Sequence, residues 1–255
     1  NWHDGLKAAL KIISQQHILD WYLDKQLPTT QYDWYLIWGA PAQGDLFYNL
    51  DSLQGKKALL LTTHPRSEVG IKRIKKCDVI FCESQPVYEK VRQQGIRAIK
   101  AFGTDTDFFY PTDIIKDIEY FYPATFSPWK RQSLIAIYGS HLLCVGTVQP
   151  DGQSELKACV DNGVRVEVGY FPAETIKSYY QQARNVLIPA IHGSERTVLE
   201  AMSMNILPKV WSDNIRASSY VTEFNESGID SPREFVEKNY SHRIYAENLL
   251  KGMEL

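Results

Sequence analysis

Residues Gly193 to Asn214, GSERTVLEAMSMNILPKVWSDN, combine a glycine–serine turn, a short amphipathic helix pattern and a closing strand pattern. Ser194 is a favourable N-cap residue, so we expect a helix to begin directly after it. The first turn of such a helix presents backbone N–H groups, here around Arg196 to Val198, that suit a phosphate. The segment therefore predicts a strand–turn–helix unit with an anion site at the helix start.

Strand and helix patterns alternate on both sides of this segment. Strand patterns cover residues 17–23, 32–39, 56–64, 77–84, 96–103, 118–125, 141–148, 164–171, 184–190 and 207–213. Helix patterns cover residues 3–16, 67–76, 85–95, 128–139, 153–163, 172–183 and 231–253, the last as one long helix or a pair. Such alternation with short connections predicts α/β architecture, with parallel sheets covered by helices on both faces.

One polar stretch, at residues 104–117, carries no hydrophobic period and contains a proline, which indicates a linker between domains. We expect two Rossmann-like, doubly wound domains that face a cleft, at residues 1–111 and 112–232. Residues 233–255 would form a closing helix that packs back on the first domain. Because Asn1 already falls near the first helix, we expect the first strand of the N-terminal domain to be missing.

Composition excludes several classes of protein. The 255 residues carry a net charge of −2, which gives no electrostatic case for binding nucleic acid or an anionic membrane. No apolar run reaches the roughly 18 residues of a membrane span, and no secretory signal pattern is present. The four cysteines lack metal-ligand or redox spacing, so we expect a reducing, cytoplasmic setting.

Known catalytic fingerprints are absent from the loops that follow the predicted strands. The sequence has no Walker loop, GxGxxG, HExxH or GxSxG, which argues against a P-loop NTPase, a dinucleotide oxidoreductase or a zinc hydrolase. A dinucleotide fingerprint before Asn1 would lie outside this sequence, so the oxidoreductase class is weakened only. Interdomain clefts are common small-molecule sites, and the loops at the carboxyl ends of the strands are the candidates.

Two charged residues of the 193–214 segment, Arg196 and Glu200, can be interpreted in two ways. Their i, i+4 spacing is that of an ordinary surface ion pair, with Val198 beside them in the core. Alternatively, Arg196 supplies a cation at the mouth of the anion site, and Glu200 accepts hydrogen bonds from hydroxyl groups such as those of a ribose. Spacing alone leaves both open.

The same segment resembles the donor-binding segment of GT-B glycosyltransferases, in particular the retaining family 4 group, whose pattern runs roughly E-G-F-G-x-x-x-L-E-A-M-A-x-G-x-P-V-V-x-S-D. The matching positions are Glu200, Ala201, Met202, Pro208, Val210, Ser212 and Asp213. FGTDTDFFYP (102–111) resembles the N-G-V-D-x-x-x-F-x-P linker of those enzymes, and NYSHRIYAENLL (239–250) is similar to the ending of CgeB-type proteins.

Three departures accompany this resemblance. His192 stands where the family carries a first glutamate, with Glu195 nearby but out of register. Thr125 stands where an arginine is expected, five residues before Lys130. The third departure is that the family's first strand and glycine loop are missing from this sequence. Since each of these groups touches the donor in the family, donor binding is expected to be weakened, altered or lost.

The resemblance implies roles for individual residues. Lys130 falls where the family carries a phosphate-binding lysine, and His64 where it places a cleft histidine; we take both as catalytic candidates. The donor-binding candidates are His192, Ser194, Arg196, Thr197, Val198 and Glu200. Trp38 and Gly39 are candidates for the acceptor side.

Structural interpretations of these residues stay open beside the functional ones. Lys130 and Arg131 would open a helix, either facing the phosphate or simply solvated. His64 would hydrogen-bond a loop, His192 would fill its turn, and Trp38 and Trp129 would pack in the core.

The expected reaction is transfer of a hexose from a nucleotide-diphosphate sugar to a hydroxyl acceptor, by resemblance with retention. We expect no metal and no cofactor beyond the nucleotide-sugar substrate. The acceptor would be a glycan, a lipid or a small molecule, and peripheral contact with a membrane stays open. The alternatives are a degenerate GT-B protein that serves as a binding or scaffolding module and a nucleotide-sugar epimerase, for which no acid/base carboxylates can be placed.

Overall fold

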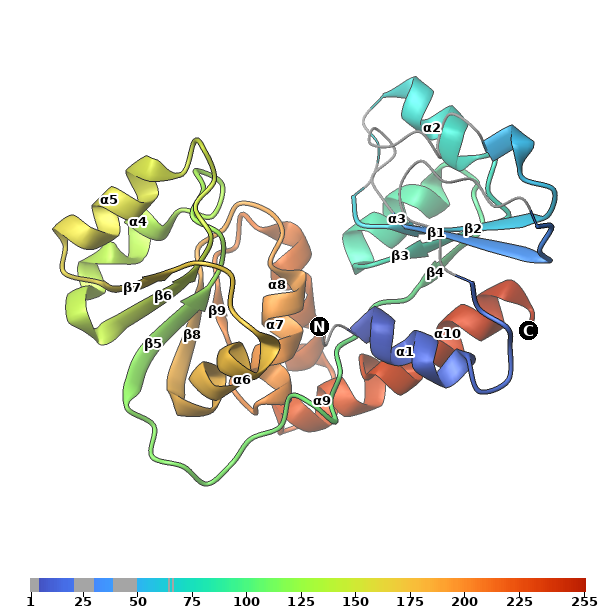
Figure 1. Cartoon of the computed structure of the whole chain (residues 1–255). Helices are drawn as coiled ribbons and strands as arrows, with labels where there is room; N and C mark the ends of the chain where they lie inside the picture. The colour runs from blue at the N-terminus through green and yellow to red at the C-terminus, as the bar shows by residue number, and fades with distance from the viewer. Residues whose placement is uncertain (1–4, 21–29, 39–49, 64, 66) are drawn as a thin grey trace. The chain divides into compact units, whose positions relative to one another are not determined.

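The computed structural model describes residues 5–20, 30–38, 50–63, 65 and 67–255, and Figure 1 shows the arrangement of its elements. They form two compact units, each built around a parallel sheet. We name the first the four-stranded unit (residues 9–102 and 243–255) and the second the five-stranded unit (residues 103–242, with the chain before Ala9).

The four-stranded unit has the sheet order β1-β2-β3-β4 among its described residues, and all neighbouring strands are parallel. Its strands are β1 (Trp34–Trp38), β2 (Lys56–Leu61), β3 (Val79–Cys82) and β4 (Ala98–Lys100). Its helical elements are the greater part of α1 (Gly5–Ile13), η2 (Leu50–Ser52), α2 (Glu68–Ile74) and α3 (Gln85–Gln93). β3 is buried along its whole length, as expected of a central parallel strand covered on both faces.

The predicted strand at 17–23 is wrong over its described part. His17 to Asp20 lie outside any strand, and the N–H of His17 donates to the carbonyl oxygen of Ile13 at 3.0 Å. The chain therefore leaves α1 through a turn that is still bonded to the helix end, and β-forming side chains alone did not make a strand there. Residues 21–23 lie outside the described part.

The five-stranded unit has the order β7-β6-β5-β8-β9, also parallel throughout. Its strands are β5 (Ile118–Pro123), β6 (Leu142–Gly146), β7 (Arg165–Val168), β8 (Ala183–Ile188) and β9 (Lys209–Val210). Three of its helices are α5 (Gln153–Asp161), α6 (Ala173–Gln182) and α7 (Glu195–Ser203). The chain winds outward from β5 in one direction and then from β8 in the other, which is the strand order of a Rossmann domain.

The helix predicted over 128–139 is wrong in its first turn. Lys130 lies in a turn, its N–H donating to the carbonyl oxygen of Ser127 at 2.9 Å, and Arg131 has a left-handed backbone with φ of 52°. Helical structure begins only with α4 (Gln132–Ile135) and continues in the 3-10 segment η3 (Ala136–His141). The left-handed residue breaks the helix and leaves the lysine in the loop.

One helix escaped the sequence analysis, and the tail proved to be a pair. α8 (Ile215–Glu226) carries serine, threonine and valine, which are weak helix formers, yet Asn214 caps it by accepting from the N–H of Ala217 at 3.2 Å. The tail forms α9 (Pro232–Asn239) and α10 (His242–Met253). α10 packs so closely on the four-stranded sheet that a Cβ at Gly252 would lie 2.4 Å from the ring of Phe81.

Candidate functional site

The two loops at the switch point of the five-stranded sheet carry most of the predicted donor residues. β5 and β8 are neighbours, but the chain leaves them in opposite directions, and open α/β sheets bind ligands in the crevice expected at such a point. The N–H of Ile191 donates to the carbonyl oxygen of Trp129 at 2.9 Å and joins the two loops. Lys130 and Ser194 are thereby brought together from positions 64 residues apart.

Lys130 lies inside this crevice. Its Nζ donates to Oγ of Ser194 at 2.8 Å and to the carbonyl oxygen of His192 at 3.5 Å. Burial lowers the pKa of Lys130 to about 8; the carboxylate of Glu195 raises it and the guanidinium of Arg216 lowers it further. A Cβ at Gly193 would lie 2.9 Å from Nζ, and Gly193 has φ of +73°, so glycine is needed there. The ammonium is charged at pH 7 and held near its titration.

Glu195 and Arg216 form an ion pair beside Lys130 that sequence reasoning missed. Oε1 of Glu195 lies 2.9 Å from Nε of Arg216, without hydrogen-bond geometry at that oxygen, and the glutamate side chain is 7% exposed. Arg216 comes from the first turn of α8, which packs against α7. Because α8 itself was not predicted, no pattern placed its arginine at the site; the only signal was the Asn214 cap two residues earlier.

The start of α7 differs from the prediction. Ser194 occupies the N-cap position, but with a left-handed φ of 71° and no side-chain cap, since its hydroxyl instead accepts from Lys130. The N–H of Val198 is already bonded to the carbonyl oxygen of Ser194 at 3.1 Å, so it does not belong to the anion site. The N–H groups before it, of Glu195 to Thr197, have no carbonyl partner within the helix. Thr197 is buried, and Arg196 is exposed at the helix start.

Glu200 is buried, which excludes the interpretation of Arg196 and Glu200 as a pair of two exposed surface charges. Its Oε2 accepts a hydrogen bond from the hydroxyl of Tyr180 at 3.0 Å. Tyr180 is fully buried, and this burial together with the Glu200 carboxylate raises its pKa well above the usual value. Val198 is in the core, as the structural interpretation expected.

His192 and Trp129 face each other across the two loops. Their rings stack with centroids 6.0 Å apart and an interplanar angle of 21°. Burial and the nearby guanidinium of Arg216 lower the pKa of His192, so the imidazole is neutral at pH 7. Trp129 is therefore half-buried against the histidine and does not lie in the core.

The end of β9 closes the rim of the crevice. Arg131 donates to the carboxylate of Asp213, an ion pair in which the arginine is the less exposed partner. Nδ2 of Asn214 donates to the carbonyl oxygen of Gly193 at 2.9 Å. Asn214 thus holds the glycine turn in place, and Asp213 holds the β5 loop.

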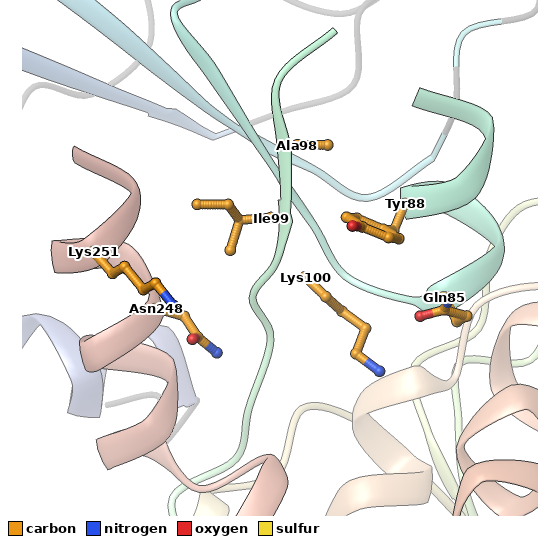
Figure 2. A pocket seen from close by; sticks show the side chains of 7 residues that line it. All are labelled: Gln85, Tyr88, Ala98, Ile99, Lys100, Asn248 and Lys251. Carbon is orange, nitrogen blue, oxygen red and sulfur yellow. The ribbon is translucent and has the colours of Figure 1, made fainter. Parts of the chain in front are cut away.

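The four-stranded unit contains a separate hollow of about 360 Å³, shown in Figure 2. It lies along the open edge of β4, between α3 and α10, and is lined by Gln85, Tyr88, Ala98, Ile99, Lys100, Asn248 and Lys251. Trp38, the acceptor-side candidate, ends β1 with its side chain exposed and is not part of this hollow. The candidates Gly39 and His64 lie outside the described residues.

No group of three or more histidine, cysteine, aspartate or glutamate side chains among the described residues is arranged to hold a metal ion. Nor is any helix among those residues both long and apolar enough to cross a bilayer.

No protein-family model matches the chain, and no curated protein matches it either. Solved structures do. The chain is similar to the lipopolysaccharide outer core galactosyltransferase WaaB, with 13% identity, 80% of this chain and 69% of that chain covered, and a TM-score of 0.56. It is also similar to AviGT4, a glycosyltransferase involved in avilamycin A biosynthesis, with 13% identity. The match covers 87% of this chain and 97% of that chain, with a TM-score of 0.52.

A third structure is described as trehalose-6-phosphate from E. coli bound with UDP-2-fluoro glucose; it has 7% identity, with 98% of this chain and 76% of that chain covered and a TM-score of 0.60. At these identities the similarity establishes the fold alone. The chain has the GT-B fold, with Rossmann-like α/β units, which confirms the predicted fold class.

Proposed function

We propose that the chain is a glycosyltransferase that transfers a hexose from a nucleotide-diphosphate sugar to a hydroxyl acceptor. The observation that carries the proposal is the half-buried, charged Lys130 at the switch point, which donates a hydrogen bond to Ser194 at the start of α7. Burying an ammonium costs free energy, so a cation kept in a crevice beside a helix N-terminus indicates a function, here the binding of a diphosphate.

In the proposed reaction Lys130 and the first-turn N–H groups around Thr197 stabilise the charge on the departing diphosphate. Glu200 accepts hydrogen bonds from the ribose, and His192 contacts the sugar. By the family resemblance, transfer proceeds with retention, His64 contacts the sugar from the other unit, and Trp38 and Gly39 belong to the acceptor side. Catalysis rests on positioning and on electrostatic stabilisation, with no metal or other cofactor assigned. The cytoplasmic setting is part of the proposal and is supported by four free, buried cysteines.

The test is calorimetric titration with UDP, GDP, ADP and dTDP and with their glucose conjugates. UDP-glucose comes first, because a solved structure of the same fold holds a UDP-sugar analogue. The informative variant is Glu200→Gln, which keeps an acceptor oxygen for Tyr180 but removes the carboxylate. Glu200→Ala would also leave the buried Tyr180 hydroxyl unpaired and so confuse folding with binding.

Tight binding of one nucleotide by the wild type, weakened at least tenfold in Glu200→Gln, is the expected result. Arg184→Met is the matched control, since Arg184 lies near the amino end of β8, away from the switch point. A folded wild type that binds none of the nucleotides would contradict the proposal and favour a degenerate binding module.

A further inference from the structure

We propose that Arg216 is a second cation for the diphosphate and that Glu195 holds it beside Lys130 until the nucleotide sugar binds. This inference rests on the proposed function, and it concerns a residue that no motif in the sequence marks. It is argued from the charges of Lys130, Arg216 and Glu195, which lie close together.

The first step of the argument is the charge in the crevice. Lys130 and Arg216 both lie near the carboxylate of Glu195, and Arg216 perturbs both Lys130 and His192 electrostatically. Arg131 is matched separately by Asp213. The group of Lys130, Arg216 and Glu195 therefore carries one net positive charge, with His192 neutral beside it. An anion is attracted to this group, more strongly the more negative charge it carries, and a neutral ligand is not.

The second step is the geometry of the ion pair. Glu195 is 6% exposed, and Arg216 is the cation that lies beside its carboxylate. Yet Oε1 is not hydrogen-bonded to Arg216 despite the 2.9 Å separation from Nε. A guanidinium presents five N–H donors in a planar fork that suits phosphate oxygens. Arg216 can therefore keep its electrostatic pairing with Glu195 while part of the fork turns to a phosphate.

The third step concerns which element supplies the second cation. The β5 loop has the uncharged Thr125 at the position five residues before Lys130, and its Oγ1 lies 3.2 Å from Oγ1 of Thr147. Arg216 approaches the crevice from a different element, the first turn of α8. It brings to Lys130 a second positive charge that the β5 loop does not supply, since Arg131 of that loop pairs with Asp213.

The experiment measures the affinity of the full chain for UDP, GDP and ADP, and for the corresponding monophosphates, in wild type and variants. Arg216→Met should weaken the tightest diphosphate about 10- to 100-fold and reduce its preference over the monophosphate. Arg216→Lys should retain part of the affinity, since it keeps the charge and loses the fork. Arg184→Met, an exposed arginine at the opposite end of β8, should match the wild type.

A double variant separates direct binding from simple support of Glu195. If Arg216 serves only to neutralise the buried carboxylate, Glu195→Gln combined with Arg216→Met should bind the diphosphate as tightly as the wild type, which would overturn the inference. If Arg216 binds the phosphate, the double variant stays weak. The double variant also lacks an uncompensated buried charge, so it remains informative should Arg216→Met alone fail to fold.

The two proposals fail in different ways. Loss of affinity in Lys130→Met with full affinity in Arg216→Met would overturn only the role of Arg216. A wild type that binds none of the nucleotides would overturn the proposed function and, with it, this inference.

Discussion

The two units of this protein differ in how far their paired charged side chains are exposed to water. At the switch point of the five-stranded unit, Glu195 is 7% and Arg216 20% exposed, and Lys130 is buried enough for its pKa to fall to about 8. In the four-stranded unit, Glu254 pairs with Lys56 at 3.2 Å and Arg97 at 2.9 Å, with all three side chains about half exposed. Water screens the charges around Glu254, so this group changes the free energy of unfolding little. The charges around Glu195 are shielded from water, and placing them there costs free energy. The difference indicates where function resides.

The sharpest test of this comparison replaces a lysine in each unit. Lys130→Met should weaken nucleotide-diphosphate binding roughly 100-fold while raising Tm by roughly 2–4 °C at pH 7, because a half-buried, partly desolvated ammonium is removed. The lowered pKa means that the unfolded chain binds more protons between pH 8 and 10.5, so wild-type stability rises with pH there and the gain in Tm should shrink by pH 10.

Lys56→Met is the counterpart in the four-stranded unit and should change neither property, because its pair with Glu254 is exposed. Calorimetry and thermal unfolding measure both variants. A fall in the Tm of Lys130→Met would show that the lysine stabilises the fold, and it would contradict the claim that its charge is kept for binding.

Close packing makes the four-stranded unit vulnerable in another way. Gly252→Val should destabilise the protein by about 2–3 kcal/mol, because a Cβ there would meet the Phe81 ring at 2.4 Å and the Cδ1 of Ile99 at 2.9 Å. Glu247→Val adds the same β-branched residue to α10 at an exposed position and serves as the control. Urea unfolding measures both; equal midpoints would contradict the close approach of α10 to β3 and β4.

The titration of Lys130 should appear in binding. Nucleotide-diphosphate affinity should fall roughly tenfold between pH 7 and pH 9, as the lysine passes through its pKa of about 8 and loses its charge. His192 does not contribute in this window, because its lowered pKa keeps it neutral throughout. Lys130→Arg should bind with a flat profile over the same range. A sloping profile in that variant would assign the titration to another group.

The smallest effect is expected at the exposed charges. The pKa of Glu254 is lowered by hydrogen bonding to Lys56 and by its charge, so whatever stability it adds is present above its normal pKa and lost as pH falls through the lowered one. Since this side chain and its two partners are about half exposed to water, Glu254→Gln should leave Tm at pH 7 within experimental error of the wild type. A clear fall in the Tm of Glu254→Gln would mean that the exposed ion pairs of Glu254 also contribute to stability.

Much of the fold was predictable because its signals are local. The buried β3 strand, the amphipathic α3 and the 193–214 segment each carry a period that a single window reveals, and alternation predicted parallel sheets. Prediction failed where local signals were weak or misleading: a strand pattern after α1 that is a turn, and a helix pattern at Lys130 broken by the left-handed Arg131.

The sequence by itself determined the alternating elements, the core face of α7 and the presence of Lys130, Glu200 and a glycine turn near one another along the sheet edge. Only the tertiary structure decided which charges meet. Arg216 reaches Glu195 because α8 packs against α7, and Ser194 accepts from Lys130 instead of capping its helix because the β5 and β8 loops converge. Pairing and burial depend on groups distant in the chain, and no local pattern encodes the free energy of placing a charge between them.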